Sequence, residues 1–112
     1  MPPELTAEEA LRNNPPPPRD VRAQVAQGAV VVTWGDPPAV AIPHSYSDRV
    51  VAYRVYRRGP GETELKPIGS ASTHRYVDSS ARKGSSYEYA VTSVREHQVE
   101  GPRSDAVLVT VR

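Results

Sequence analysis

Residues 84–94, Gly-Ser-Ser-Tyr-Glu-Tyr-Ala-Val-Thr-Ser-Val, decide the fold of this chain. Tyr87, Tyr89 and Val91 recur at every second position, and smaller or polar residues stand between them. A period of two is typical of a β-strand that buries one face. We therefore expect a long strand over residues 87–94.

Two earlier segments carry the same period. Residues 30–34 read Val-Val-Val-Thr-Trp, and residues 53–58 read Tyr-Arg-Val-Tyr-Arg-Arg. Alternate side chains of a strand point to opposite faces of its sheet, so each segment has one apolar side. The residues expected to face inward on these two strands are Val30, Val32, Trp34, Val51, Tyr53 and Val55.

Weaker signals predict four more strands, at residues 21–25, 65–71, 74–77 and 107–111. Pro67 interrupts the second of these, and proline has no N–H to donate to a sheet, so that strand should lie at an edge. Seven short strands separated by Gly- and Pro-containing turns are typical of an all-β, antiparallel Greek-key sandwich.

Composition agrees with one such domain. The chain has 112 residues, with 12 Pro, 7 Gly, 6 Tyr and no Cys. A length of this order suits a single domain. A formal net charge of +1 gives no general attraction to nucleic acid or to an anionic membrane. No window reaches eighteen apolar residues, so the sequence predicts no transmembrane segment.

The Trp of the second strand, the Tyr-x-Val of the third and the Gly-x-x-Tyr-x-Tyr-x-Val of residues 84–91 together resemble a fibronectin type III domain. The resemblance covers roughly residues 18–112. It implies a tyrosine corner, in which the Tyr87 hydroxyl bonds to the backbone near residues 81–83. It also implies a structural core that contains Trp34, Tyr53, Val55, Tyr87, Tyr89 and Val91.

The chain departs from that family in two ways. Ala81 stands where the family usually has Leu or Val, and the loop at residues 35–49 is longer than usual. The Arg-Gly-Asp motif that binds integrins in some members is absent from the sequence. The resemblance therefore implies a scaffold, and because sandwiches host many unrelated roles it implies no particular activity.

Residues 1–18 form a separate unit in this interpretation, and residues 19–112 form the sandwich domain. Thr6 and Glu9 suggest a capped short helix, which either frays or docks Leu5 and Leu11 on another surface. Pro15 begins a run of four prolines that favours a polyproline spacer, with an SH3-type ligand as the alternative. We also expect Met1 to mark the place where a leader was removed.

Catalysis, metal binding and cofactor binding find no support in the sequence. The three histidines, His44, His74 and His97, are far apart in the chain. Ser45 follows His44, but nothing nearby resembles an oxyanion hole. No residues have zinc or calcium spacing, and the Gly59-Pro60-Gly61 segment lacks the rest of a phosphate-binding loop. We expect neither an enzyme nor a cofactor.

Two surfaces are candidates for binding a partner. Arg54, Tyr56 and Arg58 should project from the outer face of the third strand, where Arg57 and Arg95 could add charge. Arg and Tyr are enriched at interface hot spots, although an ordinary solvated face is the alternative. Thr92 and Val94 should stand beside them on the neighbouring strand. The second candidate is a pair of loops, containing Val40, Ile42, His44, Tyr46, His97 and Val99, whose apolar residues either bind or pack locally.

These features predict a non-catalytic spacer or protein-interaction module in a secreted or cell-envelope protein. The alternative is a carbohydrate-binding or accessory domain of a larger secreted hydrolase. We expect the partner to be another protein, with polysaccharide as an alternative, and we expect no nucleic acid. The lack of cysteine is compatible with a cytoplasmic location as well.

Overall fold

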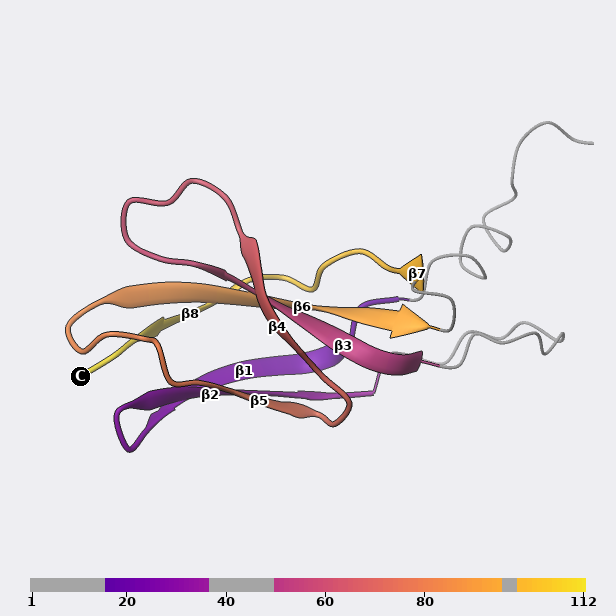
Figure 1. Cartoon of the computed structure of the whole chain (residues 1–112), viewed down its shortest axis with the longest axis horizontal. Coiled ribbons are helices and arrows are strands. Elements are labelled where there is room, and N and C mark those ends of the chain that lie inside the picture. Colours follow the sequence, from indigo (N-terminus) through magenta and orange to yellow (C-terminus); the bar gives the residue numbers. More distant parts are fainter. Residues whose placement is uncertain (1–15, 37–49, 96–98) are drawn as a thin grey trace, which may run out of the picture.

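Two antiparallel sheets pack face to face in the computed structural model, which describes residues 16–36, 50–95 and 99–112 (Figure 1). The first sheet has the order β1-β2-β5, with β1 at Arg19–Ala26, β2 at Ala29–Gly35 and β5 at Arg75–Asp78. Gln27 and Gly28 join β1 to β2, and both have positive φ, 52° and 80°. Positive φ at both residues defines a type I′ turn, whose twist matches that of the strands it connects.

The second sheet has the order β4-β3-β6-β7, and β8 also pairs with β6. Its strands are β3 at Val50–Arg58, β4 at Lys66–Ala71, β6 at Ser86–Arg95, β7 at Val99–Glu100 and β8 at Val107–Thr110. Between β7 and β8 the Ser104 N–H donates to the carbonyl of Val91 at 2.9 Å. The expected all-β antiparallel sandwich is confirmed, and the two-residue β7 is an addition to the seven predicted strands.

The core lies between the two sheets. All six residues predicted for it are buried, and they belong to one cluster with Val30, Val32 and Val111. Trp34 and Tyr53 meet edge to face, with their ring centroids 5.3 Å apart. Full burial of a side chain of this size contributes about 1.5–3 kcal/mol. The alternating valines and tyrosines of the sequence therefore hold the sheets together.

The prediction that Val51 faces the core is wrong. The pairing of β3 with β6 shifts register between Val50 and Ala52, and Val51 is 44% exposed. Val50 packs against the core instead. A bulge of this kind displaces the alternation of side chains by one residue on its far side.

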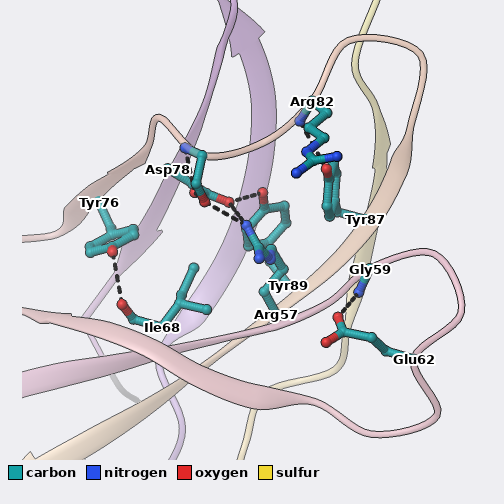
Figure 2. A network of polar contacts seen from close by, with 10 residues as sticks. Arg57, Gly59, Glu62, Ile68, Tyr76, Asp78, Arg82, Tyr87 and Tyr89 are labelled. Atoms are coloured by element: carbon teal, nitrogen blue, oxygen red, sulfur yellow. Dashed lines mark hydrogen bonds and ion pairs between the residues drawn. The ribbon is translucent and has the colours of Figure 1, made fainter.

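β4 lies at an edge of its sheet, as Pro67 predicted. Tyr76, on β5 of the other sheet, donates its hydroxyl to the carbonyl of Ile68 at 3.1 Å (Figure 2). The Tyr76 ring also lies directly over Gly69, where an added Cβ would come within 2.4 Å of the hydroxyl oxygen. Pro67 and this contact leave β4 with fewer free backbone groups for pairing with a strand of another chain.

The tyrosine corner is confirmed. The hydroxyl of Tyr87 accepts a hydrogen bond from the backbone N–H of Arg82 at 2.8 Å, inside the predicted range of residues 81–83 (Figure 2). Ala81 is buried in the core beside this contact. The corner fixes the loop that crosses from the first sheet to β6.

A buried ionic network joins the two sheets. The Asp78 carboxylate, on β5, accepts hydrogen bonds from the Tyr89 hydroxyl at 2.6 Å and from Arg57 Nη1 at 2.9 Å (Figure 2). The N–H and hydroxyl of Ser80 donate to its other oxygen. Burial alone would raise the pKa of Asp78, but the hydrogen bonds from Tyr89, Ser80 and Arg57 hold that pKa below its ordinary value. Burial and the carboxylate raise the pKa of Tyr89 well above its ordinary range.

Some predictions fall outside the described residues. The N-terminal helix is one of them, and the division at residue 18 stays a prediction, although β1 does begin at Arg19. Among the residues that the structure describes, no helix is long and apolar enough to cross a membrane.

Candidate interaction surfaces

Glu100 organises the outer face of the second sheet. Its carboxylate accepts hydrogen bonds from Arg54 Nη1 at 2.8 Å, from Thr92 Oγ1 at 2.7 Å and from the Tyr56 hydroxyl. The strand register brings these side chains to Glu100, because Arg54 lies opposite Thr92 on β6 and Glu100 lies opposite Val94. Glu100 thus reaches from β7 across β6 to β3. The side chains it contacts are held in one arrangement before any partner arrives.

These contacts shift the pKa values of the two acids involved. Burial would raise the pKa of Glu100, but hydrogen bonds from Tyr56 and Thr92, together with the Arg54 charge, bring it below its ordinary value. Burial and the hydrogen bond to Glu100 raise the pKa of Tyr56. Glu100 is therefore a carboxylate, and Tyr56 a neutral phenol, across the pH range in which proteins usually work.

Two further cations and one apolar side chain complete this face. Arg58 lies opposite Glu88 and forms an ion pair with it. Arg103 stands over the Tyr56 ring, with its guanidinium carbon 5.3 Å from the ring centroid. Leu108 is next to Glu88 in register and is 70% exposed. Arg54 and Arg58 thus already have acidic partners within the chain.

The structure brings some of the predicted site residues together and separates others. Arg54, Tyr56 and Arg58 alternate along β3, and Thr92 and Val94 lie in register beside them. Thr92 and Val94 are only 1% and 4% exposed, so in this face they support their neighbours and offer almost no surface of their own.

Arg57 does not belong to that face. It points toward the other sheet, where it contacts Asp78, so the expectation that it adds charge beside Arg54 is wrong (Figure 2). Its position follows from the alternation that also turns Tyr53 and Val55 inward.

The predicted binding loops are mostly outside the described residues. Val40, Ile42, His44, Tyr46 and His97 all lie there. Val99 is half-buried in β7, opposite Arg95. The role of these loops stays a prediction.

His74 belongs to a polar cluster at one end of the core. Its Nε2 atom is 3.1 Å from the Tyr53 hydroxyl and 2.9 Å from a carboxylate oxygen of Asp36. The His74 and Tyr53 rings also pack edge to face, with centroids 5.4 Å apart. Within the described ranges, no three His, Cys, Asp or Glu side chains are grouped so that they could hold a metal ion. We therefore interpret the cluster as a structural contact that holds the Tyr53 hydroxyl in place.

The outer face of the first sheet carries a row that the sequence analysis missed. Arg22 on β1 lies opposite Thr33 on β2, and Thr33 lies opposite Arg75 on β5. Both arginines are exposed. The alternation of β1 indicates that Arg22 points outward, but its alignment with Arg75 depends on the pairing of each strand with β2, which no local pattern reveals.

Comparison with known proteins supports the fold. No protein-family model matches the chain, and no curated protein matches it in sequence. Among solved structures, an Fn3-like protein from Clostridium thermocellum is similar over 88% of this chain and 94% of its own, with 20% identity and a TM-score of 0.69. The kinase region of twitchin from C. elegans covers 88% of this chain with 19% identity and a TM-score of 0.73.

A β-1,2-glucanase from Parabacteroides distasonis is also similar, over 86% of this chain, with 22% identity and a TM-score of 0.67. The chain spans 17% of the twitchin segment and 12% of the glucanase. At these identities the likeness shows the fold alone. The described residues therefore have the fold of a fibronectin type III domain, as the resemblance implied.

Proposed function

We propose that this fibronectin type III-type domain is a non-catalytic module that binds another protein through the outer face of a sheet. The observation that carries the proposal is the set of side chains fixed around Glu100. Arg54 and Tyr56 are hydrogen-bonded to the carboxylate, and Arg103 is stacked on the Tyr56 ring. Side chains that are already ordered lose little conformational entropy on binding. Arg and Tyr on a rigid strand are also the residue types enriched at hot spots.

The same proposal places the module in a secreted or cell-envelope protein. Support comes from the proline-rich segment that precedes the sandwich and from the lack of cysteine, which is compatible with that location. Fractionation of the native source tests the location directly, because the proposal requires the chain in the envelope or the culture medium.

Affinity capture with matched variants tests the binding role. The full chain is immobilised beside two folded variants, Arg54→Ala/Tyr56→Ala/Arg58→Ala on the second sheet and Arg22→Ala/Gln24→Ala/Arg75→Ala on the first. We expect a protein that the parent retains and at least one variant loses. Loss in the first variant assigns the Glu100-centred face, and loss in the second assigns the other sheet. If the parent retains no protein, the binding role is wrong and the domain acts as a spacer.

A second candidate is an accessory domain of a larger hydrolase. The glucanase with a similar fold contains much more chain than this domain covers, which is the observation that favours this candidate. Direct binding of polysaccharide has weaker support, because sugars stack on exposed aromatic rings and the Tyr56 ring is covered by Arg103. Sedimentation of the domain with insoluble polysaccharides separates the candidates, since a protein-binding module stays in the supernatant.

A further inference from the structure

Arg22, Thr33 and Arg75 form one row across the first sheet. Each residue lies directly opposite the next in the pairing of β1, β2 and β5. Neighbouring strands are about 4.8 Å apart, so the two arginine Cα atoms are about 10 Å apart. The alternation that turns Val30, Val32 and Trp34 inward turns this row outward.

Neither guanidinium of the row has a partner among the residues that the structure describes. Across the described ranges, Arg22 and Arg75 make no ion pair, ring contact or side-chain hydrogen bond. In contrast, Arg54, Arg57 and Arg58 each pair with an acid of this chain. Acidic side chains of the chain thus neutralise Arg54, Arg57 and Arg58, whereas no acid among the described residues neutralises Arg22 or Arg75.

Few acidic side chains belong to the first sheet. Its three strands contain two, Asp20 and Asp78. Asp78 faces inward and is 3% exposed. The Asp20 carboxylate lies beside Gly35, one row away, and forms no ion pair with either arginine of the row. Among the described side chains of this sheet, the row itself therefore carries two positive charges and no negative one.

An apolar strip lies next to the cations. Gln24, Val31 and Val77 form the neighbouring row, and Val77 is 42% exposed. The surface made by these two rows, which we name the Arg22–Arg75 face, consists of Arg22, Gln24, Val31, Thr33, Arg75 and Val77. It combines exposed methyl groups with two guanidinium groups that pair with no described acid, all on one sheet.

We propose that the Arg22–Arg75 face docks an acidic segment of a partner protein. Two carboxylates about 10 Å apart receive Arg22 and Arg75, and an apolar side chain covers Val77. The planar guanidinium matches a carboxylate with two parallel hydrogen bonds, so charge complementarity identifies the chemistry of the partner. This inference rests on the proposed binding role but places the contact on the first sheet, as the alternative to the face around Glu100.

Other anionic partners fit this surface less well. Trp34 and Tyr76, the aromatic residues of β2 and β5, belong to the core side, so no described ring of this face stacks on a sugar. Nucleic acids and anionic bilayers are recognised through many cations at once, and the face has two.

A defined probe tests the docking. The full chain is titrated with an eight-residue peptide in which Glu alternates with Val and Ser, and with a control peptide that has Gln in place of Glu. Fluorescence polarisation gives the dissociation constant, and nitrogen–proton NMR follows the backbone and the arginine Nε signals. We expect the acidic peptide to shift the signals of β1, β2 and β5 and to bind about tenfold more tightly than the control.

Matched variants give the decisive comparison. Arg22→Gln/Arg75→Gln should weaken the acidic peptide about tenfold, whereas Arg54→Gln/Arg58→Gln on the other sheet should change its affinity less than about twofold. Arg22→Lys/Arg75→Lys keeps the charge but loses the planar fork, so its affinity should fall between those of the parent and the Gln variant. All three double variants change exposed or half-buried side chains outside the core, and a thermal melt confirms that each is folded.

Four results would overturn the inference. Equal affinity for the two peptides would show that carboxylates do not contribute to binding. NMR shifts confined to β3 and β6 would show that the peptide binds the second sheet. Unchanged affinity of the acidic peptide for Arg22→Gln/Arg75→Gln would show that these two arginines do not bind it. In the capture experiment, the fourth result is a protein retained by the parent and by Arg22→Ala/Gln24→Ala/Arg75→Ala but lost by Arg54→Ala/Tyr56→Ala/Arg58→Ala. That result would leave the proposed binding role intact and refute the Arg22–Arg75 face.

Discussion

Asp78→Ala should destabilise the domain more than any other single change at a polar residue described above. The substitution removes the acceptor of two inter-sheet hydrogen bonds, from Tyr89 at 2.6 Å and from Arg57 at 2.9 Å. The Tyr89 side chain is fully buried, so its hydroxyl would keep no access to water. The Arg57 side chain is 22% exposed and could recover part of its hydration.

The size of the effect follows from these contacts. Leaving a buried hydroxyl unsatisfied costs about 1–3 kcal/mol, and a lost hydrogen bond between charged groups costs about 1.5–3 kcal/mol. Because Arg57 recovers some hydration, we expect a total of about 3 kcal/mol. In a domain of this size each kcal/mol lowers Tm by about 4–8 °C, so Tm should fall by roughly 12–24 °C.

Urea unfolding followed by tryptophan fluorescence measures this loss. Trp34 is the single tryptophan of the chain and is 5% exposed, so its emission reports the core. Ser80→Ala is the matched control, because it removes an exposed donor to the same carboxylate and should cost about 1 kcal/mol or less. A loss below about 1 kcal/mol for Asp78→Ala would refute the role assigned to the network.

The network also predicts a dependence on pH. The pKa of Asp78 is lower in the folded chain than its ordinary value of 3.8. The folded state therefore releases this proton more readily than the unfolded state does, and the stability from the carboxylate is present above pH 3.8. That contribution is lost as the pH falls through the lower, folded pKa. The difference between the parent and Asp78→Ala should accordingly shrink in this acid range.

Three further changes should separate essential contacts from dispensable ones. Gly69→Ala places a methyl group 2.4 Å from the Tyr76 hydroxyl oxygen and should cost about 1–3 kcal/mol in urea unfolding. Tyr87→Phe removes the acceptor for the Arg82 N–H and should cost about 1–2 kcal/mol, which a thermal melt detects as a lower Tm. Leu108→Lys changes a side chain that is 70% exposed, so the same melt should give a stability within about 0.5 kcal/mol of the parent; a larger loss would mean that Leu108 packs in solution.

The sequence predicts the core well because a strand repeats every two residues. Trp34, Tyr53 and Tyr89 could be placed inward from alternation alone, and Pro67 identified an edge strand because proline lacks an N–H. The resemblance to a known family supplied the tyrosine corner. Alternation failed at Val51, where a bulge changes the face that the residue occupies.

The binding surfaces were harder to predict because they depend on register between distant strands. Glu100 lies on a two-residue strand, too short for a periodic signal, yet its pairing with Val94 brings it to Arg54 and Tyr56. Arg22 and Arg75 meet in one row only because both pair with β2. The alternation of β3 could have placed Arg57 inward, but it could not have identified Asp78 on the other sheet as its partner.

β6 is covered on both faces and paired along both edges. Residues 89–94 are buried without a break, β3 pairs along one edge, and β7 and β8 pair along the other. Backbone amides in such a strand exchange with solvent deuterium only when the whole domain opens, so their exchange rates measure the free energy of global unfolding. Any ligand that binds the folded domain slows that exchange in proportion to its occupancy, whichever face it contacts. Deuterium uptake at the β6 amides that pair with β3 can therefore detect a partner even when the contact surface itself gives no signal.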